Sequence, residues 1–133
     1  MKVKVIIERG ADGLFSYYMP ESVSGFFLNA QGTTVEEAQR EFLSIYAEGR
    51  EMYLEEGKEV PELEFEYEYD VSSFLNYYSG ILSKSGLEKV TGINQKQLWH
   101  YSSGRRKPTR RTIEKIQFGL NNLSRELGQV HFV

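Results

Sequence analysis

The sequence predicts an α+β domain over residues 1–70, followed by an all-α domain over residues 71–133. Three observations predict this division. Short segments of the first part alternate apolar and polar residues, as half-buried strands do, around one longer segment with helical spacing. In the second part, apolar residues recur mainly at the steps of three and four that helices show. The net charge also changes sign at Asp70.

The charge difference between the two parts indicates two different partners. Residues 1–70 hold 6 Lys and Arg against 16 Asp and Glu, whereas residues 71–133 hold 10 against 3, so net charges of −10 and +7 combine to the overall −3. A basic part suits a polyanion, because each Lys or Arg that neutralises a phosphate releases a counterion. An acidic part is repelled by that polyanion and suits a basic protein.

The composition indicates where the protein resides in the cell and whether it forms oligomers. The chain has no cysteine, which excludes a disulfide framework and a Cys-based zinc site. No apolar run approaches the ~20 residues of a membrane span, so we expect a cytoplasmic protein without a membrane partner. Each part is near the size at which a lone core is marginal. We therefore expect a homodimer or higher homo-oligomer, or packing between the two parts.

Three strands open the first domain. The first strand is predicted by an alternation of Val3, Val5 and Ile7 with Lys2, Lys4 and Ile6, which gives it one strongly apolar face. The Gly- and Asp-containing segment 9–13 favours a turn, in which Asp12 is a turn residue. Residues 14–19 and 25–30 predict the next two strands, and the three together predict an antiparallel meander.

One helix follows, over roughly residues 35–56. Thr34 is expected to be its N-cap, and Glu37 completes a capping box. Gly57 suits the position after the helix, and Pro61 prevents continuation. The expected apolar face has steps of three and four: Val35, Ala38, Phe42, Ile45, Gly49 and Met52.

The segment Glu64–Asp70 predicts a fourth strand, which completes a β-β-β-α-β order. Its aromatic residues point to one face and its carboxylates to the other. Because a row of carboxylates repels itself, Lys2 and Lys4 would supply cations if the first and fourth strands are neighbours.

These carboxylates do not predict an enzyme. A metal site for phosphoryl chemistry needs carboxylates that converge from different elements, whereas here they lie in rows typical of a solvated or protein-binding face. No nucleophile motif is present, and neither His100 nor His131 has an acid positioned nearby in sequence. We predict no catalytic residue, no metal site and no cofactor; a divalent-metal nuclease is the alternative that this prediction disfavours.

A helix-turn-helix motif is the sharpest prediction in the second domain. Leu87 and Val90 give a short helix an inner face, and Gly92 suits a left-handed stop. Asn94 caps the next helix, whose inner face includes Leu98. Two short helices joined by a Gly-containing turn are typical of this motif.

The second helix of such a motif presents its first residues to the major groove. Gln can bond bidentately to adenine and Lys to guanine, while clustered cations hold phosphates without reading sequence. The alternative is an ordinary helical bundle with a solvated polar face, and His100 could read a base or simply be exposed. We expect Trp99 to belong partly to the core. The predicted DNA-binding residues are Asn94, Gln95, Lys96, Gln97, His100, Tyr101, Arg105, Arg106, Lys107, Arg110 and Arg111.

Two further helices should support the motif. Residues 71–78 predict the first, capped by Asp70 or Ser72. After Pro108, Thr109 is expected to cap a long final helix, followed by a short edge strand over residues 129–133 that could pair with a second subunit. The final helix covers the core, forms a dimer interface, or does both, through a heptad-like stripe of Ile113, Ile116, Leu120, Leu123 and Leu127.

Two stretches of the sequence resemble known families. Residues 87–120 resemble Xre-type helix-turn-helix repressors, through "LEKVTGINQKQLWHYSSGRRKP". Residues 1–70 resemble the HicB antitoxin domain, through the strand order, the Asp12–Gly13 turn and the helical segment "TTVEEAQREFLSIYAEG". HicB domains often have a Pro-rich, Gly-containing segment between the second and third strands, which "MPESVSGFFLNAQG" matches only in part.

The resemblance implies a degenerate ribonuclease-H-like fold without catalytic carboxylates. It further implies that the acidic domain binds a HicA-like toxin, a small basic protein that cleaves mRNA, and that the basic domain binds operator DNA to repress the shared operon. We therefore expect a type II antitoxin and autorepressor. The competing hypothesis is a transcriptional regulator whose N-terminal domain senses a ligand or another protein.

Overall fold

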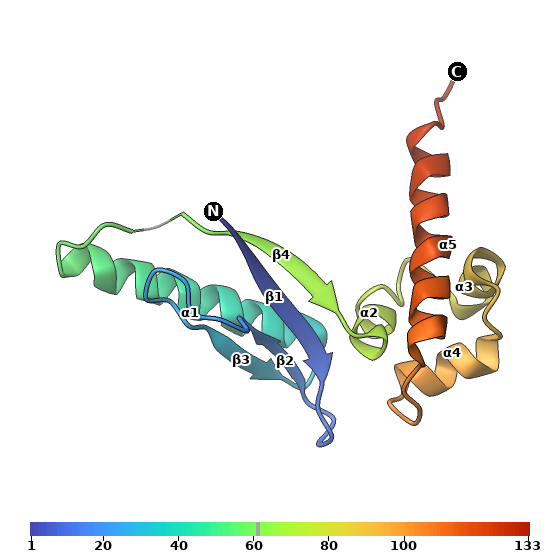
Figure 1. Cartoon of the computed structure of the whole chain (residues 1–133), viewed down its shortest axis with the longest axis horizontal. Coiled ribbons are helices and arrows are strands. Elements are labelled where there is room, and N and C mark those ends of the chain that lie inside the picture. Colours follow the sequence, from blue (N-terminus) through green and yellow to red (C-terminus); the bar gives the residue numbers. More distant parts are fainter. Residues whose placement is uncertain (61) are drawn as a thin grey trace. The chain divides into compact units, whose positions relative to one another are not determined.

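The computed structural model describes residues 1–60 and 62–133, which form four strands and five helices. They divide into two compact units, Met1–Ser73 and Phe74–Val133 (Figure 1). The α+β class predicted from the sequence is confirmed. The boundary lies three residues after the predicted one, within the helix that follows the last strand. The predicted role of Pro61 lies outside the described residues.

The first unit contains a mixed four-stranded sheet in the order β3-β2-β1-β4. Strands β1 (Lys2–Arg9), β2 (Phe15–Tyr18) and β3 (Asn29–Gly32) form the predicted antiparallel meander. Strand β4 (Glu64–Tyr69) pairs in parallel with β1. The helix α1 (Val35–Glu55) connects β3 to β4 and packs on the sheet (Figure 1).

The third strand begins four residues later than predicted. Ser24 and Gly25 have positive φ angles of 51° and 83°, and Val23 and Phe26 exchange backbone hydrogen bonds of 2.9 Å across them. This tight turn occupies the start of the predicted strand. The prediction for residues 25–28 was wrong because nothing in the local composition signals a left-handed Ser24.

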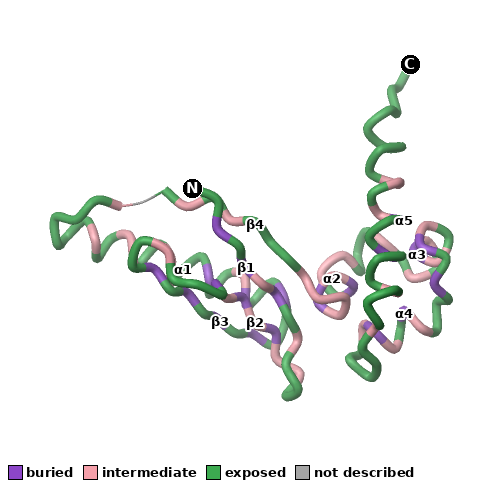
Figure 2. The backbone as a smooth tube through the Cα atoms, in the orientation of Figure 1, coloured by how far each residue is buried: buried purple, intermediate pink, exposed green. Residues whose placement is uncertain are grey.

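The core of the first unit lies between the sheet and α1. Val3, Val5 and Ile7 are buried on the face towards the helix, as their alternation predicts (Figure 2). On α1, Ala38 and Phe42 are fully buried, and the Phe42 ring contacts those of Tyr17 on β2 and Phe65 on β4. The buried positions of α1 lie in the half nearest its N-terminus, so the sheet is covered mainly at that end.

Local signals set both ends of α1, as predicted. The Thr34 hydroxyl accepts a hydrogen bond from the Glu37 backbone N–H at 3.1 Å. The Glu37 carboxylate, however, accepts from the backbone N–H and hydroxyl of Thr33, at 3.3 and 3.0 Å, in place of the expected Thr34 N–H. Gly57 follows the helix with a φ of 72°, the left-handed conformation expected there.

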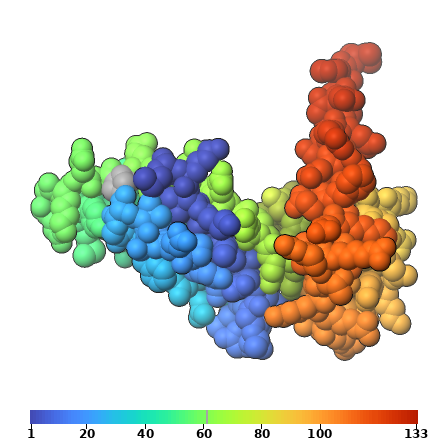
Figure 3. Space-filling view, in the orientation of Figure 1, coloured from blue at the N-terminus to red at the C-terminus, as the bar shows by residue number. Residues whose placement is uncertain are grey.

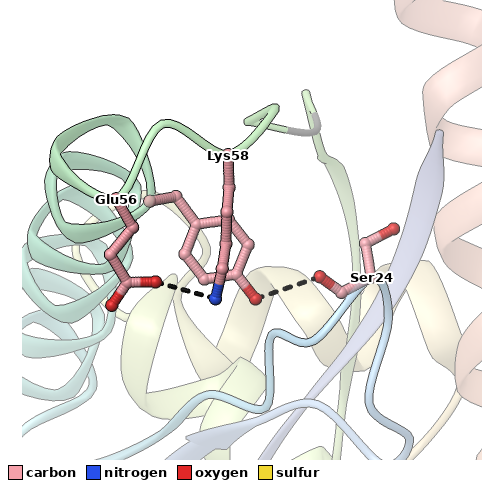
Figure 4. Close-up of polar contacts among 4 residues, drawn as sticks. Ser24, Glu56 and Lys58 are labelled. Carbon is pink, nitrogen blue, oxygen red and sulfur yellow. Dashed lines mark hydrogen bonds and ion pairs between the residues drawn. The ribbon is translucent and has the colours of Figure 1, made fainter.

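Aromatic contacts fix the far end of α1. The Tyr53 ring lies 4.7 Å from that of Phe26, and its hydroxyl donates to the Ser24 carbonyl oxygen at 3.2 Å. Lys58 lies over the same ring and pairs with Glu56 at 2.7 Å (Figure 4). The turn at Ser24 and the end of α1 therefore hold each other in place.

The charged face of the sheet has the predicted pairing. Lys2 and Lys4 of β1 lie 3.5 and 3.2 Å from Glu66 and Glu68 of β4. Because all four side chains are more than half exposed, these ion pairs relieve repulsion along β4 and add little stability.

Asp70 begins α2 (Val71–Tyr77), as expected. One carboxylate oxygen accepts from the Ser73 backbone N–H at 2.8 Å, and the other accepts from the Arg9 N–H at 3.0 Å. This side chain therefore fixes the start of α2 to the end of β1.

The second unit is helical. After the last turns of α2 it contains α3 (Lys84–Thr91), α4 (Gln95–Ser102) and α5 (Arg110–Gly128). Gly119 of α5 touches α3 so closely that a Cβ there would overlap the Val90 carbonyl oxygen. The buried hydrophobic side chains of this unit are Leu75, Leu87, Ile93, Leu98, Tyr101 and Ile116, and Thr91 is buried with them.

The stripe of α5 is covered only near its centre. Ile116 is buried, but Ile113 and Leu127 are 39% and 61% exposed. The C-terminal part of α5 stands clear of the rest of its unit (Figure 3). Residues 129–133 form no strand within the single chain and are exposed, so their pairing as an edge strand with a second copy stays a prediction. Within residues 1–60 and 62–133, no helix combines the length and apolar character that crossing a membrane requires.

Candidate nucleic-acid interface

The turn between α3 and α4 is fixed by its own polar groups. Gly92 has a φ of 75°, and its N–H donates to the Glu88 carbonyl oxygen at 2.8 Å. The buried Thr91 hydroxyl donates to Leu87 at 2.7 Å and accepts from the Ile93 N–H at 3.1 Å. With Ile93 in the core, this turn sets where α4 begins.

Two side chains satisfy the first N–H groups of α4. The side-chain oxygen Oδ1 of Asn94 accepts from the Lys96 backbone N–H at 2.7 Å, as predicted for a cap. The Glu88 carboxylate accepts from the Gln95 N–H at 2.9 Å. Because its oxygen is used as a cap, Asn94 offers a ligand chiefly its amide nitrogen.

Five of the eleven predicted DNA-binding residues lie together. Around a shallow concave patch of about 420 Å³ lie Asn94, Lys96, Gln97, His100 and Arg106. We call these five residues the α4 patch. They present amide, imidazole and cationic groups, the types that bond to base edges and phosphates.

The other predicted residues do not line this patch. Gln95, Arg105, Lys107 and Arg111 are exposed beside it in sequence, and Arg110 lies 4.0 Å from Glu114 one turn further along α5. In the described part of the chain, Lys96, Arg105, Arg106, Lys107 and Arg111 make no ion pair. Their charge is therefore available to an anionic ligand.

Tyr101 was wrongly predicted to contact DNA. Its side chain is only 5% exposed and packs in the core with Leu98, three residues earlier. That spacing of three was visible in the sequence and places both residues on the inner face of the helix.

Trp99, expected to belong partly to the core, has about half of its surface covered. Its side chain is 51% exposed, and the Arg105 guanidinium lies 5.8 Å from its ring. Because Leu98 and Tyr101 occupy the inner face, Trp99, turned by about 100° from Leu98, faces outward.

The surroundings of His100 favour its neutral form. Burial lowers its pKa below the ordinary value, and the nearby charges of Arg105, Arg106 and Lys96 lower it further. Its Nδ1 atom is buried without a hydrogen-bond partner in the described residues. At neutral pH the ring therefore adds a polar group to the patch and no charge.

The first unit offers a different surface. The exposed face of its sheet carries Glu64, Glu66 and Glu68, and α1 adds a row of exposed glutamates. No group of three metal-ligating side chains forms among residues 1–60 and 62–133. A groove of about 410 Å³ lies on the same unit, lined by Lys2, Val3, Lys4, Ile6, Pro20, Glu21 and Val23.

Comparison with protein-family models, curated proteins and solved structures returned no match for this chain. Its function has to be inferred from the two surfaces themselves.

Proposed function

We propose that this protein is a DNA-binding autorepressor and antitoxin, in which α3 and α4 act as a helix-turn-helix. The observation that carries the proposal is the α4 patch, because amide and imidazole groups gather with unpaired cations near the start of a short, outward-facing helix. In helix-turn-helix proteins, that part of the second helix enters the major groove.

Within the patch, we assign sequence reading to Lys96, Gln97 and His100. Arg106 and the exposed cations Arg105, Lys107 and Arg111 hold phosphates. Gln95, at the first position of α4, adds an exposed amide near the groove. Arg110 joins them once DNA competes for it with Glu114.

Operator binding by this motif commonly requires two copies. Two recognition helices about 34–36 Å apart fit two half-sites one helical turn apart. The stripe of α5 leaves Leu127 61% exposed and Leu120 and Leu123 partly exposed, which offers an apolar surface for a second copy. We therefore propose a homodimer that binds a palindromic operator.

The acidic unit is proposed to bind a basic protein, a HicA-like mRNA-cleaving toxin. The support is its net charge of −10 over residues 1–70 and the exposure of its glutamates. A surface of this sign repels DNA and attracts a cationic partner. The protein would neutralise the toxin by covering it, with no chemistry of its own.

A second candidate function is a transcriptional regulator that senses a ligand. The groove beside Lys2 and Lys4 favours it, because its volume of about 410 Å³ falls in the range of small-molecule sites. The presence or absence of a neighbouring gene for a small basic protein separates the two candidates.

The test combines gel shifts with co-expression. Duplex DNA from upstream of the gene should bind with nanomolar affinity and with a steep salt dependence. Co-expression should protect cells from the neighbouring basic protein. Undetectable binding to the upstream duplex at low salt would overturn the proposal of a repressor. Binding to the duplex without protection of the cells would exclude the antitoxin role and favour the ligand-sensing regulator.

A further inference from the structure

Trp99 is a large apolar side chain on the outside of the proposed recognition helix. It is 51% exposed, although Leu98 before it and Tyr101 after it are buried. Its ring is edge-on to that of His100, with the ring centres 5.7 Å apart. Exposed aromatic surface beside a binding patch is typical of a contact with a partner.

The surroundings of Trp99 are cationic. Lys96 lies one turn earlier on α4, and the Arg105 guanidinium lies 5.8 Å from the centre of the indole ring. Neither cation makes an ion pair within the described residues. This charge suits a polyanion and repels a basic protein.

The indole group can donate a hydrogen bond and cannot accept one. The described part of the chain contains no acceptor bonded to its Nε1–H, and Trp99 does not line the α4 patch. A donor-only group outside the reading surface is better matched to phosphate oxygens than to the mixed donors and acceptors of base edges.

We propose that Trp99 and Arg105 form one contact with the sugar–phosphate backbone of duplex DNA. The indole packs on a deoxyribose and donates from Nε1 to a phosphate, while the guanidinium held near its ring neutralises a neighbouring phosphate. The contact sets affinity and leaves sequence preference to Lys96, Gln97 and His100. This inference rests on the proposed DNA-binding function.

Trp99 is the only tryptophan in the chain, so its fluorescence reports this contact alone. The full-length protein is titrated with the duplex from upstream of its gene and with a scrambled duplex of the same composition. Both should protect Trp99 from quenching by acrylamide. Trp99→Ala should weaken binding of both duplexes about tenfold, with their affinity ratio and the salt slope unchanged.

Companion variants separate the parts of the contact. Trp99→Phe keeps a ring beside Arg105 but loses the donor, so we expect a smaller loss of about threefold. Arg105→Ala should lower the salt slope by about 0.9. Phe27→Ala, which removes a 61% exposed aromatic ring from the acidic unit, should change none of these quantities. Thermal melting of each variant checks that it is folded.

Three results would overturn the inference. If the duplexes bind but Trp99 stays open to acrylamide and both of its variants bind normally, the contact does not exist and the repressor proposal still stands. If Trp99→Ala weakens only the upstream duplex, Trp99 reads sequence. If a basic protein protects Trp99 and DNA does not, it belongs to a protein interface. Absence of any duplex binding would instead overturn the proposed function itself.

Discussion

Leu98 and Trp99 are neighbours in α4, yet their exposed fractions are 0% and 51%. With 3.6 residues per turn, adjacent side chains point in directions about 100° apart. A short helix packed on one side can therefore bury only one of them. The same geometry buries Tyr101, exposes Lys96 and leaves His100 partly buried, so the residues that the core takes determine which side chains line the α4 patch.

At this scale, Gln97 and Arg106 are expected to differ in role. Gln97→Ala should remove about 1–3 kcal/mol of preference for the correct base at one position of the operator. Arg106→Ala should weaken binding to every duplex alike and lower the salt slope by about 0.9. Gel shifts at several salt concentrations with matched and mismatched duplexes measure both effects. If Arg106→Ala changes sequence preference, its position in the α4 patch reflects base reading.

The pH dependence of DNA binding should come from His100. Its pKa in the free protein lies below the ordinary value of about 6.5, and phosphates nearby would raise it. Binding therefore takes up a proton, and affinity should rise as the pH falls below about 6.5. His100→Gln should abolish that rise, whereas His131→Gln should keep it. A pH-independent affinity would contradict this assignment.

The lowered pKa of His100 has the opposite effect on folding: it favours DNA binding at lower pH but disfavours the folded state there. Because the folded protein lowers the pKa of His100, the unfolded chain binds more protons, and stability from this group is lost as the pH falls through the folded-state pKa. Thermal melting of the free protein should show a loss on the acid side that His100→Gln removes.

Among elements, contacts between α3 and α5 depend on the absence of a side chain at Gly119. Gly119→Ala should improve helix propensity by about 1 kcal/mol, but its Cβ would collide with the backbone at Val90. Since backbone cannot move as a side chain can, we expect a net loss of about 1–3 kcal/mol. Gly128→Ala is the matched control in the same helix, because a Cβ there meets nothing. Denaturant unfolding of both variants tests this, and equal stabilities would show that α3 and α5 can separate at no cost.

The elements that the sequence predicted well are those with local signals. The caps Thr34, Asn94 and Thr109 and the left-handed Gly92 all lie where expected, because each acts through hydrogen bonds within three or four residues. The start of β3 depends on pairing with β2 and on the turn at Ser24, neither of which is local. Tyr101 was misplaced because aromatic character alone does not show which face of a short helix packs inward.

At the scale of the whole molecule, α5 has an apolar surface that its own unit leaves exposed. Leu127→Glu should weaken self-association and change melting little, since this side chain is 61% exposed. Phe118→Glu is the control, because Phe118 is 67% exposed but lies outside the stripe. Sedimentation of the two variants over a range of concentrations distinguishes them. If both variants self-associate as strongly as the unchanged protein, the stripe of α5 is excluded as the dimer interface.

The opposite charges of the two units should separate their binding properties. Charge reversal at Glu64, Glu66 and Glu68 should weaken binding to a basic protein and should not weaken binding to DNA. These carboxylates lie on a strand remote in sequence from α4, and two of them are already paired with lysines. Titration of the variant with DNA and with the basic protein measures both affinities. A lower affinity for DNA would contradict the proposal that the two units bind their partners through independent surfaces.

The uncovered end of α5 also bears on gene control. If only paired copies occupy the operator and most of the protein is monomeric, occupancy at low levels follows the square of the cellular concentration, so halving the pool lowers it about fourfold. Transcription would then resume abruptly as the protein is degraded or diluted by growth. Leu127 and the partly exposed Leu120 and Leu123 would thereby convert a gradual decline in abundance into a switch.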